Sequence, residues 1–164
     1  MLLVGNPGLS VSEQRAQFAI WAILSAPLYI SSDLRSISEE ALEILRNEEV
    51  VAINQDILGK QGFVISHERN KRIWLKNLEP SQGGEERLAV LFENTAATFS
   101  KTRFVFNLEL INWDIGSYSV RDVHAHSTVV TDVPCSYPFT FDVDESSVEL
   151  FVFTHHLNVY VAID

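Results

Sequence analysis

The side chains that could carry out chemistry include five histidines. His124 and His126 stand two residues apart on an expected strand, so both would point to one face, as in a metal-binding His-x-His pair. No third ligand follows at a recognisable spacing, and this argues against a metal site. His155 and His156 are adjacent and would alternate to opposite faces of a strand, and His67 is expected in a solvated turn.

Carboxylates offer a second kind of chemistry. Asp142, Asp144 and Glu145 could form a pair for glycoside cleavage or a set of calcium ligands, but an acidic strand end followed by a turn explains them as well. Asp33 and Arg35 are expected to form a local ion pair beyond a strand, although catalytic groups of α/β barrels also lie at strand ends. No serine-hydrolase elbow, P-loop or dinucleotide-binding motif is present. The residues alone do not complete a catalytic set.

Three tryptophans could stack on sugar rings. Trp21 lies in an apolar helical stretch and is expected in the core, and Trp74 lies on an expected strand. Trp113 with Tyr118 is the cluster that would serve an alternative function, that of a non-catalytic carbohydrate- or protein-binding β-sandwich module.

Composition limits the classes of protein and partner. The 164 residues include 22 acidic and 12 basic side chains, a formal net charge of −10, which is the wrong sign for nucleic acid. Hydrophobic residues make up 46%, as in a folded chain. No apolar run approaches the roughly 18 residues of a membrane span, and the first residues do not resemble a targeting signal. We therefore expect neither nucleic acid nor membrane as a partner.

The first third of the chain has helical and α/β character. Ser10 and Glu13 have the spacing of a capping box and predict a helix from about Val11 to Ser25. Residues 18–24 of this helix are apolar on every face, so they should be covered on several sides. A short strand is expected over 27–31, and a helix from Glu39 to about Asn47, capped by a serine at 36 or 38. The expected order of elements in residues 1–58 is thus that of β-α units around a parallel sheet.

From Gly62 onward the hydrophobic pattern has a period of two residues, which is typical of strands. About eight short strands separated by turn residues predict an antiparallel β-sandwich over residues 62–164. The expected strands are 73–75, 88–92, 104–106, 118–120, 128–130, 139–141, 148–153 and 159–163, and the turns are 80–84, 112–116 and 133–134.

Four segments carry a resemblance to a known family. They are MLLVGNPGLS (1–10), RAQFAIWAILSAPL (15–28), SDLRSIS (32–38) and VAINQDILGKQG (51–62). In this order they closely resemble glycoside hydrolase family 27, the lysosomal-type α-galactosidases and α-N-acetylgalactosaminidases. A looser likeness to the family's C-terminal domain runs through RIWLK (72–76), LAVLFEN (88–94) and YSVRDVHAH (118–126).

The resemblance implies a (β/α)8 barrel followed by an antiparallel β domain. A complete barrel takes about 250 residues. Residues 1–58 would therefore be the closing βα units of a TIM barrel, and residues 62–164 the C-terminal β-sandwich. The chain would be a C-terminal fragment of the family's fold.

The resemblance also implies a retaining hydrolase of terminal α-linked galactose or N-acetylgalactosamine on glycolipids and glycoproteins, without metal or cofactor. Both catalytic aspartates of the family lie upstream of the motif that begins at Met1, so no catalytic residue carries over. Met1 carries over as an apolar contact to the galactose ring. The resemblance further implies a lysosomal or secreted protein, and it leaves a homodimer open. We expect the 164-residue chain alone to have no glycosidase activity.

Overall fold

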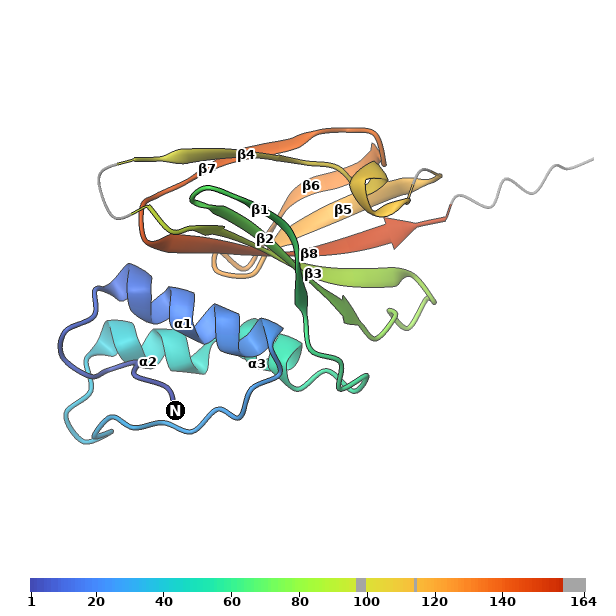
Figure 1. Ribbon diagram of the computed structural model, residues 1–164. Helices are drawn as coiled ribbons and strands as arrows, with labels where there is room; N and C mark the ends of the chain where they lie inside the picture. Colours follow the sequence, from blue (N-terminus) through green and yellow to red (C-terminus); the bar gives the residue numbers. More distant parts are fainter. Residues whose placement is uncertain (97–99, 114, 158–164) are drawn as a thin grey trace, which may run out of the picture.

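The chain folds into three stacked layers (Figure 1). A computed structural model describes residues 1–96, 100–113 and 115–157. Helices form one outer layer, a six-stranded sheet lies in the middle, and a two-stranded sheet covers the other face. The described residues contain no helix that is both long and apolar enough to cross a bilayer.

The helices and strands follow one another with short connections. Among the described residues, the helices are α1 (Val11–Ile23), α2 (Glu39–Arg46) and α3 (Glu48–Asn54), and Leu108–Ile111 form a 3-10 helix. The strands are β1 (Phe63–Glu68), β2 (Lys71–Leu78), β3 (Glu86–Asn94), β4 (Thr102–Phe106), β5 (Ser117–Asp122), β6 (Ser127–Pro134), β7 (Phe139–Val143) and β8 (Ser147–His156).

All paired strands of the two sheets run antiparallel. The large sheet has the order β1-β2-β3-β8-β5-β6, and β4 pairs with β7 in the small one. The longest ladder joins β3 to β8, with Val90 opposite Phe151 and Leu91 opposite Leu150. These two strands form the centre of the molecule and position both other layers.

The large sheet is buried on both faces. On β3, Leu88, Val90 and Phe92 pack toward the two-stranded sheet, and Ala89 and Leu91 pack toward the helices. Because a strand turns alternate side chains to opposite faces, a strand covered on both sides reads as a continuous apolar run. The expected sandwich over this region is present, with helices covering its outer face as well.

Aromatic rings fill the space between the two sheets. The ring of Phe92 meets those of Phe104, Phe106, Phe141 and Phe151 edge-on at centroid distances of 4.7 to 6.0 Å. Edge-to-face contacts of this kind add stability beyond the apolar area that they bury.

The helical layer confirms the predicted capping. The Ser10 hydroxyl accepts from the Glu13 amide at 3.2 Å, and the Glu13 carboxylate accepts from the Ser10 amide at 2.8 Å. Ser38 caps α2. Sequence reasoning missed α3, because Asn47 ends α2 and at the same time begins α3. Trp21 is half-buried and packs against the core between the helices and the sheet.

Several expected boundaries were wrong. The strand predicted over 27–31 is a single parallel bridge between Leu2 and Ile30. His67 lies in β1, which was not predicted, and not in a turn. The turn predicted at Val133 and Pro134 is the end of β6, where a proline is tolerated on an edge strand. The strand predicted over 159–163 lies outside the described residues.

Gly62 lies where the helical layer meets the large sheet. Its amide donates to the carbonyl of Ile23 at 2.7 Å. A Cβ at this position would lie 2.5 Å from the Ile23 side chain and 2.9 Å from the Leu75 carbonyl oxygen. The close approach of helix α1 to strand β2 therefore requires a residue without a side chain.

We expect Gly62→Ala to lower the free energy of unfolding by about 1–3 kcal/mol, since overpacking against backbone cannot be relieved by rotating a side chain. Gly83→Ala is the matched control, because there a Cβ would meet nothing closer than 3.5 Å. Urea unfolding of the two variants tests this. Equal stability of both would show that the backbone at Gly62 moves without cost.

Candidate functional site

The parallel bridge brings two loops together at one edge of the helical layer. The Leu2 amide donates to the Tyr29 carbonyl at 2.7 Å, and the Ser31 amide donates to the Leu2 carbonyl at 3.2 Å. Just beyond the bridge, the Asn6 side-chain amide donates to the Ser31 hydroxyl at 2.7 Å. The segments that follow Leu2 and Ile30 are thus hydrogen-bonded to each other, at the carboxyl ends of two parallel stretches of backbone.

Two glutamines of α1 hold the first of these loops. The Gln14 side-chain oxygen accepts from the Gly5 amide at 2.8 Å, and its side-chain nitrogen donates to the Leu9 carbonyl at 3.1 Å. Gln17 accepts from the Leu3 amide at 2.7 Å. Sequence reasoning missed both residues, although two amide side chains three residues apart lie on one face of a helix and were a usable signal.

Met1 lies at this edge and is 71% exposed. Its contact with a sugar ring stays a prediction. Asp33 follows the bridge and forms the predicted local ion pair, since Arg35 donates to its two carboxylate oxygens at 2.9 and 2.7 Å. These side-chain bonds, together with the Arg35 backbone amide, lower the pKa of Asp33. The carboxylate is therefore held in its charged form and is unsuited to donate a proton.

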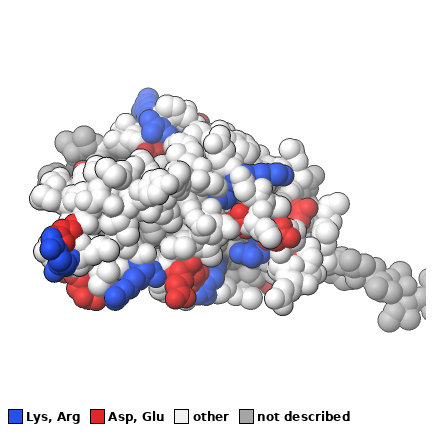
Figure 2. Space-filling view, turned by 90° about the horizontal axis from the view of Figure 1, so that it is seen from below, with Lys and Arg blue, Asp and Glu red and all other residues white. Residues whose placement is uncertain are grey.

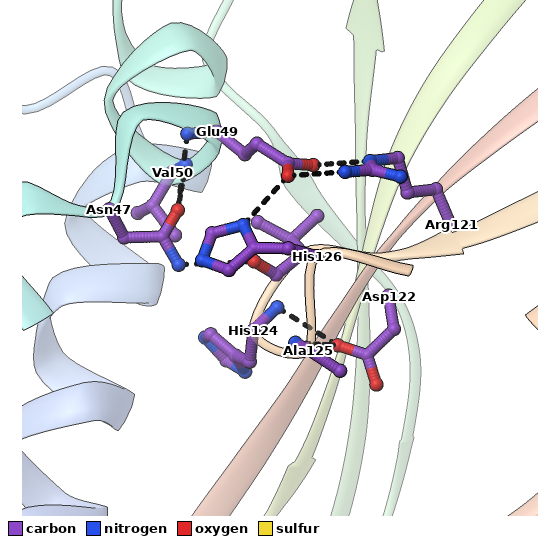
Figure 3. A network of polar contacts seen from close by, with 9 residues as sticks. Asn47, Glu49, Val50, Arg121, Asp122, His124, Ala125 and His126 are labelled. Atoms are coloured by element: carbon purple, nitrogen blue, oxygen red, sulfur yellow. Dashed lines mark hydrogen bonds and ion pairs between the residues drawn. The ribbon is translucent and has the colours of Figure 1, made fainter. Parts of the chain in front are cut away.

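A second polar cluster joins helix α3 to the turn between β5 and β6 (Figure 3). The guanidinium of Arg121 donates to both carboxylate oxygens of Glu49 at 2.7 Å, and His126 Nδ1 lies 2.7 Å from one of them. The paired Arg121 and the weaker contribution of His126 lower the pKa of Glu49, against an opposing effect of burial. Arg121 and Glu49 form a planar two-bond pair of the stronger kind.

His124 and His126 lie in this turn, so their placement on a strand was wrong. The Asp122 carboxylate accepts from the amides of His124 and Ala125 at 2.9 and 2.8 Å, and it fixes the turn. His126 has a left-handed backbone, with φ of 54°. Within residues 1–96, 100–113 and 115–157, three or more potential metal-binding side chains are nowhere gathered together.

A cleft of about 460 Å³ lies between α1, α2 and this turn. Its floor consists of the buried side chains Phe18, Ile44 and Val50. Four charged side chains also line it. His124 and His126 form its wall on the side of the β5–β6 turn, and Asn47 lies where α2 meets α3. The four charged side chains are Arg15, Glu40, Glu43 and Arg46.

Two of the other predicted acids form ion pairs at the surface. Asp142 pairs with Arg103 at 2.9 Å across β7 and β4, and Asp144 pairs with Lys101 at 2.9 Å. Both pairs are largely exposed and contribute little to stability.

His155 and His156 point to opposite faces of β8, as predicted. His155 is buried and its Nε2 lies 2.7 Å from the Ile115 carbonyl oxygen, while His156 Nδ1 lies 2.7 Å from Glu85. The Trp113 ring stacks on His155 at a centroid distance of 4.6 Å.

Tyr118 does not form an exposed aromatic pair with Trp113. It is fully buried, and its hydroxyl donates to the Tyr137 carbonyl at 2.7 Å. Because a sugar-stacking surface needs accessible ring faces, this cluster provides no platform for a carbohydrate.

The path from Leu2 through α1 to Ile30 is a strand-helix-strand unit, although the strands are reduced to one bridge. Loops at the carboxyl ends of parallel strands are where α/β enzymes place their binding sites. The fold therefore defines an α/β portion with such an edge, followed by antiparallel sheets.

Comparison with known proteins identifies the family. Residues 1–56 match the family model described as alpha galactosidase A. Human alpha-galactosidase A is 49% identical over 78 residues, covering 48% of this chain and 18% of that protein. Alpha-galactosidase 3 of Arabidopsis thaliana is 34% identical over 159 residues (94% and 34%), and the alpha-N-acetylgalactosaminidase of Gallus gallus is 33% identical over 150 residues (90% and 35%).

The solved structure of alpha-galactosidase I from Mortierella vinacea superposes with a TM-score of 0.81 at 27% identity, covering 93% of this chain and 38% of that one. The chain belongs to the family of α-galactosidases and α-N-acetylgalactosaminidases, glycoside hydrolase family 27, and corresponds to a C-terminal portion of it. It spans about a third or less of the length of these relatives.

Proposed function

We propose that the whole protein is a retaining glycoside hydrolase that removes terminal α-linked galactose or N-acetylgalactosamine from glycolipids and glycoproteins. In this proposal residues 1–58 are the closing βα units of a (β/α)8 barrel, and residues 62–164 are its C-terminal β-sandwich. The observation that carries the proposal is the parallel bridge between Leu2 and Ile30, connected through α1, within the segment that matches the family model.

The exposed side of the bridge supports a continuing barrel. Parallel strands need neighbours and are covered on both faces. Yet the residues beside the bridge expose apolar side chains: Met1 is 71% exposed, Tyr29 70%, Leu3 44% and Ile30 43%. Figure 2 shows a broad uncharged area on the side of the helices, with charged side chains toward its margins. For a chain of net charge −10, such a face fits the packing of further barrel strands and helices.

Retaining hydrolysis needs two carboxyl groups about 5–5.5 Å apart, one as nucleophile and one as acid and base. The carboxylate beside the bridge, Asp33, is held by Arg35. We therefore assign both reacting carboxylates to parts of the whole protein outside this chain. The role left to the described residues is to hold the loops at 4–9 and 31–36, with Met1 as an apolar contact to the galactose ring. The proposal includes no metal or cofactor.

Localisation and assembly are further parts of the proposal. We place the whole protein in the lysosome or outside the cell, in line with the family resemblance. A homodimer is tested by light scattering on the whole protein. The alternative, a sugar-binding sandwich module that uses Trp113 and Tyr118, is not favoured because Tyr118 is buried.

Two matched proteins test the proposal with an aryl α-galactoside. In the first, residues 1–164 replace the corresponding C-terminal portion of the Mortierella vinacea enzyme, and we expect this chimaera to release the aryl group. In the second, the 164-residue chain is assayed alone, and we expect no turnover above a blank because it lacks the carboxylate pair. The host enzyme without its C-terminal portion is the control.

A folded but inactive chimaera would contradict the proposed function. Turnover by the 164-residue chain alone would contradict the assignment of the reacting carboxylates.

A further inference from the structure

We propose that the cleft between α1, α2 and the β5–β6 turn binds a neutral saccharide unit. The cleft is formed by residues of the helical layer on one side and by His124 and His126 on the other. It lies apart from the loops at the parallel bridge, so it would be a binding site and not a site of hydrolysis. Its volume of about 460 Å³ lies within the ~300–1,000 Å³ typical of small-molecule sites.

The cleft combines an apolar floor with a polar rim. Phe18, Ile44 and Val50 are at most 7% exposed and close the base of the cleft, and Val11, which is 44% exposed, supplies accessible apolar surface. Arg15 and Arg46 on the rim are exposed. A sugar ring presents apolar C–H faces and a circumference of hydroxyl groups, and these match the exposed side chain of Val11 and the polar side chains of the rim.

The charges of the rim balance, and this favours a neutral ligand. Two guanidinium groups, of Arg15 and Arg46, and two carboxylates, of Glu40 and Glu43, line the cleft. Across the described part of the chain, none of these four side chains has a hydrogen bond or ion pair to another residue. The cleft thus offers both hydrogen-bond donors, the guanidinium groups, and acceptors, the carboxylates. Sugar hydroxyl groups can use both, since each hydroxyl both donates and accepts. A phosphate or a carboxylate would meet two repelling acids.

The junction of α2 and α3 and the β5–β6 turn are held in place before any ligand arrives. Asn47 accepts from the Glu49 and Val50 amides and donates to the Val123 carbonyl at 3.0 Å. His126 is fixed by Glu49, which is itself held by Arg121 (Figure 3). Ordering these groups in advance lowers the entropy cost of binding.

His124 contributes an imidazole that the fold does not use fully. Its Nδ1 is buried without a hydrogen bond and lies 3.8 Å from the Glu149 carboxylate, too far for one. Its side chain is 13% exposed and lines the cleft. A ligand hydroxyl that contacts this ring would alter its nuclear magnetic resonance signals.

The test follows histidine ring signals in the 164-residue chain by nuclear magnetic resonance while lactose is added. The choice of a galactose-containing probe rests on the proposed function. We expect saturable shifts at His124 and His126, and none at His67, His155 and His156, which do not line the cleft. Arg46→Gln should weaken binding about tenfold, the equivalent of one hydrogen bond to a charged group.

Glu39→Gln is the matched control, because Glu39 is exposed on the same helix but does not line the cleft. No saturable shift, or equal binding by the Arg46→Gln variant, would overturn the proposal, even if the chimaera described above is active. Larger shifts with inorganic phosphate than with lactose would also overturn it. Equal binding of maltose would support a saccharide site and remove only its link to galactosides.

Discussion

Replacing Lys76 by alanine is expected to lower the free energy of unfolding by about 3–5 kcal/mol, the range of large losses in a core. Lys76 is fully buried on β2. Its ammonium group donates to the Ala22 carbonyl at 3.2 Å, to the Ser25 hydroxyl at 2.8 Å and to the Ile53 carbonyl. One side chain of the sheet thus satisfies backbone oxygens near the ends of α1 and α3.

The size of the loss follows from two effects. Truncation to alanine leaves a cavity between the sheet and the helices. It also leaves buried carbonyl oxygens without a donor, at about 1–3 kcal/mol for each unsatisfied group. The partial negative charge of unpaired carbonyls at the last turn of a helix offsets part of the cost of burying this cation.

Lys76→Met separates the two effects, since it keeps most of the volume and removes the donor. We expect a smaller loss of about 1–3 kcal/mol. The matched control is Lys60→Ala at an exposed position, with an effect within about 0.5 kcal/mol. Urea unfolding monitored by tryptophan fluorescence gives all three values. A Lys76→Met variant as stable as the parent would show that the desolvation of the amine cancels its hydrogen bonds.

Lys76 also has a predicted pH dependence. Burial lowers its pKa from 10.5, so between the folded-state pKa and 10.5 the unfolded chain binds more protons than the folded one. The free energy of unfolding contributed by Lys76 therefore rises with pH between its folded-state pKa and 10.5. The parent should gain stability relative to Lys76→Met as the pH is raised toward 10.5.

Local signals predicted the elements that depend on neighbouring residues. Ser10 and Glu13 determine the start of α1 through their mutual hydrogen bonds. They lie only three residues apart, so the pattern is visible in the sequence. Asp33 and Arg35 interact two residues apart, and their ion pair was predicted for the same reason. Apolar runs over 88–92 and 148–153 identified β3 and β8.

Features that depend on tertiary packing were not predicted. The apolar run over 88–92 does not say which layer covers each face, and the helical layer proved to cover one of them. Lys76 looks like an ordinary polar residue of an alternating strand, because nothing local shows that α1 and α3 end above it. Glu49, Arg121 and His126 meet across 72 and 77 residues of chain, and no spacing rule reaches that far.

Glu49→Gln is expected to lower the free energy of unfolding at neutral pH by about 1–2 kcal/mol. Hydrogen bonds to charged groups contribute about 1.5–3 kcal/mol. The value is reduced here because the Arg121 side chain is 42% exposed and solvent screens part of the attraction. The substitution leaves Arg121 and His126 without their anion and loosens the contact between α3 and the β5–β6 turn. Glu48→Gln is the matched control, since Glu48 is exposed on the same helix.

The effect of Glu49 should disappear in acid. Its pKa is lowered from 4.5, chiefly by Arg121, so the folded state binds this proton less tightly than the unfolded chain. The stability that Glu49 contributes is therefore complete above pH 4.5 and is lost as the pH falls through the lower folded-state pKa. Unfolding curves of the parent and of Glu49→Gln should converge over that range, while Glu48→Gln follows the parent throughout. A difference that persists unchanged into acid would mean that Glu49 acts through packing and not through its charge, and that the wall of the cleft does not depend on this ion pair.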